Sequence, residues 1–316
     1  MSNNKSVFSY TVYIKLVVTN VFFLLFLTIA NANTDERYWT LQSGEKIKAE
    51  QLSYDSQSGQ VVLLIDDKKE YKLQLDELSP IDQAWIVEWD QIEREMNVLI
   101  QTLGGKFEHY TAKEEKYSTD FYVYYPSIYE INKMRPMLLL FNAGGKITRY
   151  VKQFIESCER HGIIVVGCGS FRNSDDNPEL EYEMRKRFAE LLPIIESTVP
   201  HDPKRLFMGG NSGGAWRAYH YSAWFDRPWA GIYANAGWLG GMKYYEEQYP
   251  AGMRIAMVNG NNDHSTNYYL IPDGKLLESK GNIVAVFSFE GGHQSAPPKS
   301  RSKALEWLIN ENGIYD

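Results

Sequence analysis

Residues 206–214 read LFMGGNSGG, and this stretch predicts the fold of the surrounding chain. The apolar run from Leu206 to Met208 indicates a buried strand, and GNSGG at 210–214 follows it directly. This matches the pattern Gly-x-Ser-x-Gly, in which a serine occupies a sharp turn between a strand and a helix, termed the elbow. A helix is predicted from 213 to 225. The alternative is a glycine-rich turn whose serine, Ser212, only caps that helix.

Strands and helices alternate on both sides of this turn. Buried strands are predicted at 137–141, 163–167, 205–208, 231–234, 254–258 and 283–287, and helices at 148–161, 179–199, 213–225 and 304–309. Two earlier segments, 107–112 and 120–125, alternate in the manner of antiparallel strands. The pattern predicts an α/β protein, with a mostly parallel sheet covered by helices on both faces.

A histidine is needed near Ser212, because a serine hydroxyl is a weak nucleophile until a base takes its proton. When a serine at such a turn acts as the nucleophile, the acid and then the histidine follow it along the chain. His293 comes just after the last predicted strand, so it is the predicted base. Of the remaining histidines, three precede Ser212 along the chain: His109, His161 and His201. His220 lies in the helix after Ser212, and His264 adjoins the best acid candidate. The alternative is that His293 is an ordinary loop histidine.

The predicted acid is Asp263, which follows the strand 254–258 in the turn GNND at 260–263. A carboxylate at this place would orient the imidazole and stabilise its protonated form. Asp273 is the second candidate, but it lies between Pro272 and Gly274, a composition typical of a surface turn. The alternative for Asp263 is a loop residue without a chemical role.

Backbone donors for a developing oxyanion are expected beside Ser212. One is the N–H of Gly213, the residue after the serine. The second should come from NAGG at 142–145, after the strand 137–141, with Gly144 as the best candidate. Asn142 stands where a related loop pattern, His-Gly-x-Gly, has histidine, which leaves open which amide donates.

Residues from about 106 to 312 resemble α/β-hydrolases, and in style the compact secreted esterases of the polyhydroxyalkanoate-depolymerase and feruloyl-esterase type. The turn at Ser212, the Asp263 turn and the Gly-Gly-His ending at His293 carry the resemblance. It implies a domain over 106–316 and a catalytic triad of these three residues. It also implies a serine enzyme that hydrolyses carboxylic esters through an acyl-enzyme. The alternatives are a serine peptidase on the same fold and a non-catalytic binding protein that uses its N-terminal module.

The substrate pocket is predicted beside Trp238 and Asn142, where Trp238 would wall the acyl or sugar side. A small-molecule or polysaccharide-linked ester is therefore the expected partner. Three further tryptophans lie near the helix that follows the elbow and are expected in the core: Trp216, Trp224 and Trp229.

Motifs for cofactors and metals are missing from the sequence. Gly167-Cys168-Gly169 lacks the third glycine of a dinucleotide fingerprint, and no His-Glu-x-x-His or paired-cysteine pattern occurs. We expect no cofactor and no catalytic metal.

Residues 1–32 read as a signal peptide. Lys5 and Lys15 precede an apolar run at 16–30, and Ala30-Asn31-Ala32 fits a small-residue cleavage pattern. The alternative is an uncleaved anchor, although the apolar run is short for a span, which needs about 20 residues. Cleavage near Ala32 would give a secreted or periplasmic protein with no integral membrane span.

Charge and cysteine content limit the other possibilities. The formal net charge is −7 over 316 residues, and no long basic run occurs, so nucleic acid is not an expected partner. Cys158 and Cys168 are the only cysteines. In an oxidising compartment they could form a bridge. The favoured interpretation is two buried free thiols.

A small β module is predicted at 35–78, followed by a helical linker at 79–105. Its signals are a hairpin around Ser43-Gly44, a turn at 55–59, a strand at 61–65, a charged turn at 66–69 and a strand at 71–75. Ser79 and Pro80 indicate a helix start. The module resembles the SH3-like homology domain of a yeast endocytic adaptor, and the resemblance implies a small barrel with a peptide or surface ligand. The residues that carry it are Trp39-Thr40, Gly44, the run from Gly59 to Ile65, and Leu78-Ser79-Pro80-Ile81-Asp82-Gln83. The alternative is a spacer without a ligand.

Overall fold

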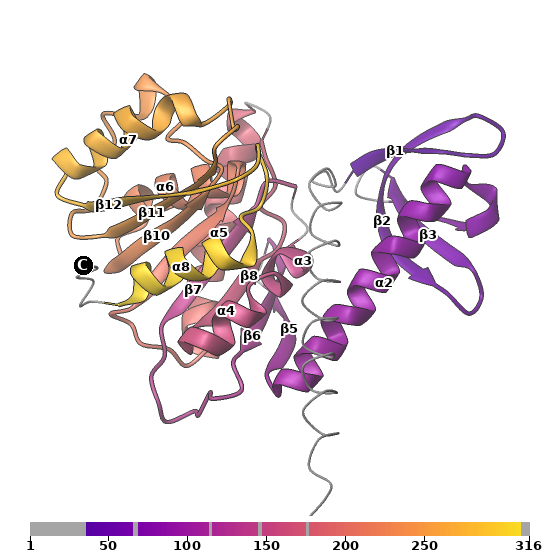
Figure 1. Ribbon diagram of the computed structural model, residues 1–316, viewed down its shortest axis with the longest axis horizontal. Helices are drawn as coiled ribbons and strands as arrows, with labels where there is room; N and C mark the ends of the chain where they lie inside the picture. The colour runs from indigo at the N-terminus through magenta and orange to yellow at the C-terminus, as the bar shows by residue number, and fades with distance from the viewer. Residues whose placement is uncertain (1–35, 66–68, 114–115, 145–146, 175–176, 311–316) are drawn as a thin grey trace, which may run out of the picture. The chain divides into compact units, whose positions relative to one another are not determined.

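The computed structural model describes residues 36–65, 69–113, 116–144, 147–174 and 177–310 (Figure 1). The predicted signal peptide at 1–32 lies outside the described residues, as does most of the turn predicted at 66–69. All described residues belong to one compact unit, 34–316. Within them, every helix is too short or too polar to cross a membrane.

The first strands form a small antiparallel sheet, in the order β1(Glu36–Thr40), β2(Lys46–Asp55), β3(Gln60–Ile65) and β4(Lys69–Gln74). Each strand pairs with the next, as the predicted hairpins require. Trp39, Val61 and Leu63 are fully buried beneath the sheet. A short 3₁₀ turn, η2(Leu75–Glu77), follows β4. The sheet is compatible with a small β module, and the SH3-like assignment stays a prediction.

A long helix, α2(Pro80–Leu103), comes next. Ser79 caps it by accepting the N–H of Asp82, and Gly104 ends it in the left-handed conformation, with φ of 78°. Ile86 packs with the core of the small sheet, whereas Ile100, in the last turn, belongs to a core cluster of the larger sheet. The domain boundaries at 78 and 105 stay predictions.

The larger sheet has eight strands in the order β12-β11-β10-β9-β7-β8-β6-β5. Six are parallel: β7(Met137–Asn142), β8(Ile164–Cys168), β9(Leu206–Asn211), β10(Trp229–Asn235), β11(Arg254–Gly260) and β12(Ile283–Phe289). Two antiparallel strands, β5(Lys106–Lys113) and β6(Ser118–Tyr125), complete one edge. The predicted mostly parallel α/β sheet is confirmed.

Helices cover both faces of this sheet (Figure 1). One face packs on α5(Pro178–Thr198), α6(Gly213–Trp224) and α7(Asn267–Ser279), and the other on α3(Ile147–Lys152), α4(Ile155–His161) and α8(Pro298–Ile309). Successive side chains of a strand point to opposite faces. Accordingly Leu139 of β7 lies in the first of these layers and Leu138 in the second.

The single helix predicted at 148–161 is wrong, because the structure has two helices, α3 and α4, separated at Gln153 and Phe154. The guanidinium of Arg301, on α8, donates to the main-chain oxygen of Gln153 and, at 3.2 Å, to its side-chain oxygen. A continuous helix would use that main-chain oxygen for its own ladder. This contact with a distant residue leaves no local signal in the sequence.

Both cysteines are buried free thiols, as the favoured interpretation predicted. Cys158 lies in α4 and Cys168 ends β8, in different core layers. Burial raises the pKa of both thiols.

Candidate active site

Ser212 occupies the turn between β9 and α6 in a backbone conformation that L residues rarely adopt, with φ of 55° and ψ of −119°. Glycine is required at positions 210 and 214 because the main chain of the turn approaches the main chain of β7 closely there. A Cβ atom on Gly210 would lie 2.5 Å from the main-chain oxygen of Phe141, and one on Gly214 would lie 2.2 Å from the same oxygen. The two glycines of the motif therefore permit the strained turn that holds Ser212.

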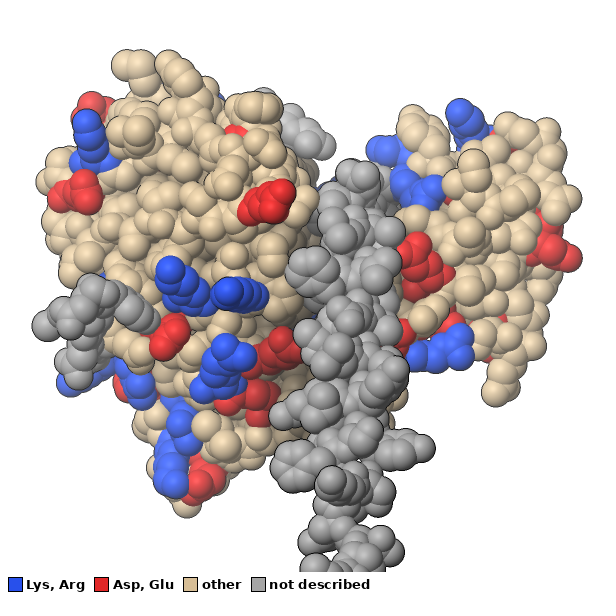
Figure 2. Space-filling view, in the orientation of Figure 1, with Lys and Arg blue, Asp and Glu red and all other residues tan. Residues whose placement is uncertain are grey.

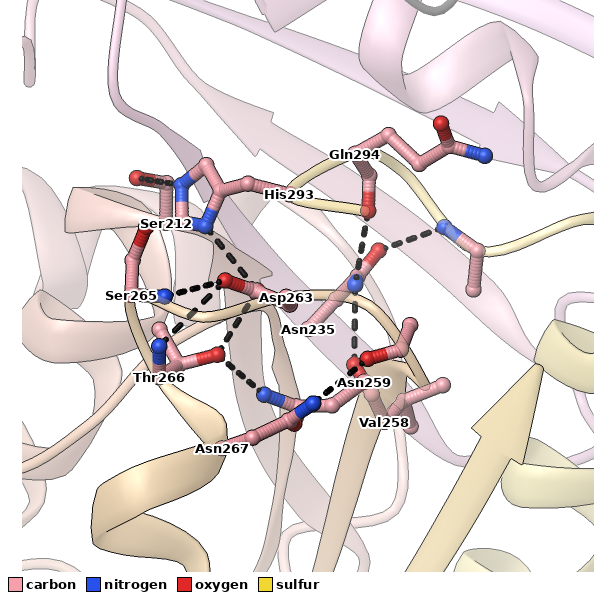
Figure 3. Close-up of polar contacts among 12 residues, drawn as sticks. Ser212, Asn235, Val258, Asn259, Asp263, Ser265, Thr266, Asn267, His293 and Gln294 are labelled. Atoms are coloured by element: carbon pink, nitrogen blue, oxygen red, sulfur yellow. Dashed lines mark hydrogen bonds and ion pairs between the residues drawn. The ribbon is translucent and has the colours of Figure 1, made fainter. Parts of the chain in front are cut away.

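The structure brings Ser212, His293 and Asp263 together (Figure 3). Nε2 of His293 lies 2.9 Å from Oγ of Ser212, and Nδ1 of the same ring lies 3.0 Å from Oδ2 of Asp263. The Asp263 side chain is fully buried, whereas that of His293 is 37% exposed. The residues follow the carboxyl ends of β9, β11 and β12, the edge where open parallel sheets place their ligands. The arrangement can activate a serine oxygen as a nucleophile.

Asp263 sits in a polar network that keeps it ionised. Its Oδ2 also accepts the Thr266 hydroxyl at 2.7 Å, and its Oδ1 accepts the N–H groups of Ser265 and Thr266 at 3.0 and 3.3 Å. Burial alone would raise the pKa of Asp263, but the Thr266 hydrogen bond, the charge and hydrogen bond of His293 and the Ser265 N–H lower it below its ordinary value. The carboxylate is thus an anionic partner for the imidazole.

Thr266 and Asn259 extend this network, and sequence reasoning missed both. Nδ2 of Asn259 lies 2.5 Å from Oγ1 of Thr266, and both residues are almost fully buried. The Thr266 hydroxyl can accept from the amide while it donates to Asp263. A threonine three residues after the acid is too common a spacing to be a signal.

The two predicted oxyanion donors follow neighbouring strands. Gly213 is the first residue of α6, where an N–H has no partner in its own helix and where the helix dipole favours negative charge. Gly144 follows β7 in a half-buried turn whose Ala143 oxygen accepts the N–H of Asn173 at 2.7 Å. Asn142 is buried at the end of β7, in register with Asn211. A joint role of these amides stays a prediction.

An aromatic pair, Trp238 and Tyr269, lies next to the elbow, one residue on a loop and the other on a helix. A Cβ atom on Gly237 would lie 3.2 Å from the main-chain oxygen of Ser212, so this loop touches the turn. Trp238 follows it and stacks on Tyr269 of α7, with ring centres 3.9 Å apart. Tyr268, beside Tyr269, is 80% exposed. Sequence reasoning selected Trp238 but not the two tyrosines, which carry no motif.

Asp273, the second acid candidate, is not in a surface turn, and that prediction is wrong. It is buried within α7, where its oxygens accept the Leu239 N–H at 2.8 Å and the Tyr245 hydroxyl at 2.7 Å. Burial raises its pKa despite these two hydrogen bonds. The neighbouring proline and glycine resemble a turn, but the helix continues through both.

On the face shown in Figure 2, acidic and basic side chains are interspersed. Across the part of the chain that the structure describes, no group of three or more His, Cys, Asp or Glu side chains could hold a metal ion.

Comparisons with known proteins agree with this fold. No family profile matches the chain, and no curated protein matches it. The feruloyl esterase module from Clostridium thermocellum, complexed with sinapinate, is 14% identical with a TM-score of 0.52, over 68% of this chain and 91% of that one. A thermostable esterase is 16% identical with a TM-score of 0.52, over 64% and 62%. A putative dipeptidyl aminopeptidase IV from Bacteroides ovatus is 12% identical with a TM-score of 0.52, over 87% and 43%. The chain has the α/β-hydrolase fold.

Proposed function

We propose that this protein is a serine hydrolase that cleaves carboxylic esters through an acyl-enzyme intermediate. One observation carries the proposal: Ser212, at a positive φ, lies 2.9 Å from an imidazole whose other nitrogen lies 3.0 Å from the buried carboxylate of Asp263. Nucleophile, base and orienting acid are thus in hydrogen-bonded sequence, as serine catalysis requires.

Each residue has a distinct role in this mechanism. His293 takes the proton of Ser212 as the serine oxygen attacks the ester carbonyl. It then passes the proton to the leaving alcohol. Asp263 fixes the tautomer of the ring and stabilises its protonated form. The N–H groups of Gly213 and Gly144 would bind the oxyanion, and one such donor contributes about 3–4 kcal/mol. Water, activated by the same imidazole, then releases the acid.

A small-molecule or polysaccharide-linked ester is the proposed substrate. Trp238, stacked on Tyr269, offers an aromatic wall beside the elbow, and Asn142 lies at the end of the adjoining strand β7. The shared fold with a feruloyl esterase module is compatible with ester cleavage. A serine peptidase is the second candidate, since the fold is also shared with a putative dipeptidyl aminopeptidase IV.

The hydrolase domain is proposed to belong to an exported protein with a small N-terminal module. The chain is exported after cleavage near Ala32. A module at 35–78, SH3-like by sequence resemblance, binds a peptide or another surface, and a helix at 79–105 leads to the hydrolase domain at 106–316. The small antiparallel sheet is compatible with such a module.

A fluorophosphonate probe tests the proposed nucleophile, because its phosphorus is attacked by a serine oxygen that a base has activated. We expect mass spectrometry to locate the label on Ser212, and the label to be lost in Ser212→Ala and His293→Ala. His264→Ala is the matched control, since His264 is an exposed histidine next to Asp263, and it should be labelled like the wild type. A folded wild type that is not labelled would contradict the proposal. Turnover of p-nitrophenyl acetate against a dipeptide p-nitroanilide then separates ester from peptide cleavage.

A further inference from the structure

Asn235 is the last residue of β10, a central strand that carries no member of the proposed triad. Its side chain is almost fully buried, at 1% exposure. Nδ2 donates to the main-chain oxygens of Val258 at 2.9 Å and Gln294 at 3.1 Å, and Oδ1 accepts the N–H of Ala296 at 2.7 Å (Figure 3). Both amide hydrogens and the amide oxygen are therefore in use.

These partners lie on the segments that carry the site residues. Val258 is in β11, which leads to Asp263, and Gln294 directly follows His293. The main-chain oxygen of Asn235 accepts the N–H of Ser212 at 2.9 Å. One residue is thus bonded to the elbow, to the strand before the acid and to the loop of the histidine.

The loop of His293 is bonded to the Asn262 N–H through the Gly291 oxygen, at 2.8 Å, and to the Asn235 side chain at two further places. It follows β12, an edge strand, and has no helix or strand of its own between 290 and 297. Both main-chain groups of Ala296 are bonded: its N–H donates to Asn235, and its oxygen accepts from Arg301 at 2.7 Å. Without the Asn235 side chain one of these two bonds is lost, together with the bond to Gln294, so the segment next to His293 is held by fewer contacts.

We propose that Asn235 is a positioning residue that sets the distances from His293 to Ser212 and Asp263. This inference rests on the proposed function. Asn235 does not itself touch the reacting atoms, and acts through the three segments that it joins. A displacement of the imidazole by about 1 Å would cost about 100-fold in rate.

The test compares two buried asparagines that both bond main-chain groups. Asn282 accepts the N–H of Met253 at 3.0 Å and donates to the oxygen of Leu277 at 3.2 Å, just before β12 and at the opposite end of that strand from His293. Asn235→Ala and Asn282→Ala each remove such bonds, so both should be less stable in urea. Only Asn235→Ala should lower fluorophosphonate labelling and kcat for p-nitrophenyl acetate, by about 10- to 100-fold, with KM little changed.

The labelling rate and kcat of the two variants decide whether Asn235 positions His293. A folded Asn235→Ala that is labelled at the wild-type rate overturns the inference, as does an equal loss of kcat in Asn282→Ala, which would indicate a general stability effect. If Asn235→Ala does not fold, Asn235→Ser is measured by the same criteria. An unlabelled wild type would instead refute the proposed function itself, before the variants are compared.

Discussion

Gly214→Ala offers a test of the elbow that the structure makes quantitative. The added Cβ would lie 2.2 Å from the oxygen and 2.6 Å from the carbon of Phe141, and 3.0 Å from the nitrogen of Asn142. All three are main-chain atoms of β7, a central strand whose neighbours fix it on both sides. No side-chain rotation can relieve this contact, so α6 and the end of β7 must separate.

The size of the effect follows from these distances. Carbon contacts are favourable near 3.5 Å, so a gap of about 1 Å must open between the helix and the strand. Overpacking of this kind costs about 1–3 kcal/mol and alanine in a helix gains about 1 kcal/mol, so the expected net loss of stability is up to about 2 kcal/mol. Because β7 leads into the Gly144 loop, the same shift would misplace a proposed oxyanion donor and slow acylation about 100-fold.

Urea unfolding and fluorophosphonate labelling measure the two effects. Gly274→Ala is the control, because its Cβ would lie 3.7 Å from Val284 and 3.9 Å from Met257, in ordinary contact within α7. That variant should be labelled normally and be more stable, by up to about 1 kcal/mol. If Gly214→Ala unfolds at the wild-type urea concentration and is labelled at the wild-type rate, the steric account of the elbow is wrong.

Three further predictions concern the acids and their network. Asp263→Asn should reduce labelling of Ser212 by about 10⁴-fold, because an amide favours the wrong imidazole tautomer, whereas Asp273→Asn should be labelled like the wild type. The free energy of unfolding in urea, measured across pH, should distinguish the contributions of Asp263 and Asp273. The pKa of Asp263 is lowered, so its stabilisation is complete above its ordinary value of 3.8 and is lost as the pH falls through its folded pKa. The pKa of Asp273 is raised, so Asp273→Asn should be more stable than the wild type at pH 7, and this gap should close on acidification. Thr266→Val should cost about 1–3 kcal/mol in urea, because it leaves the buried amide of Asn259 without its acceptor and removes a donor to Asp263. Equal stability of Thr266→Val and the wild type would refute that role.

The parallel part of the sheet could be predicted because its physical basis is local. A strand buried on both faces, such as Met137 to Phe141, reads as an unbroken apolar run. The turn at Ser212 is likewise local, since the backbone contacts that exclude side chains leave glycines at fixed spacing. Chain order then selected Asp263 and His293, which the structure places within hydrogen-bond distance in the expected sequence.

The missed residues share a different cause. Asn235 bonds main-chain atoms 23, 59 and 61 residues away, and such contacts leave no pattern of residue types at the partner positions. The prediction of a surface turn at Asp273 is wrong because Pro272 and Gly274 have the composition of a turn. The buried carboxylate is instead bonded to Leu239 and Tyr245, which are distant in sequence. Arg301 likewise contacts a main-chain oxygen, that of Gln153, at the break between α3 and α4.

The two buried thiols give the molecule a pair of internal reporters. Cys158 belongs to the layer between the sheet and the helices α3, α4 and α8, and Cys168 to the layer under α5 and α6. A buried thiol with a raised pKa reacts with an alkylating reagent only when its surroundings open. The relative alkylation rates of the two cysteines in the native state therefore record which side of the sheet opens more readily, without any engineered label.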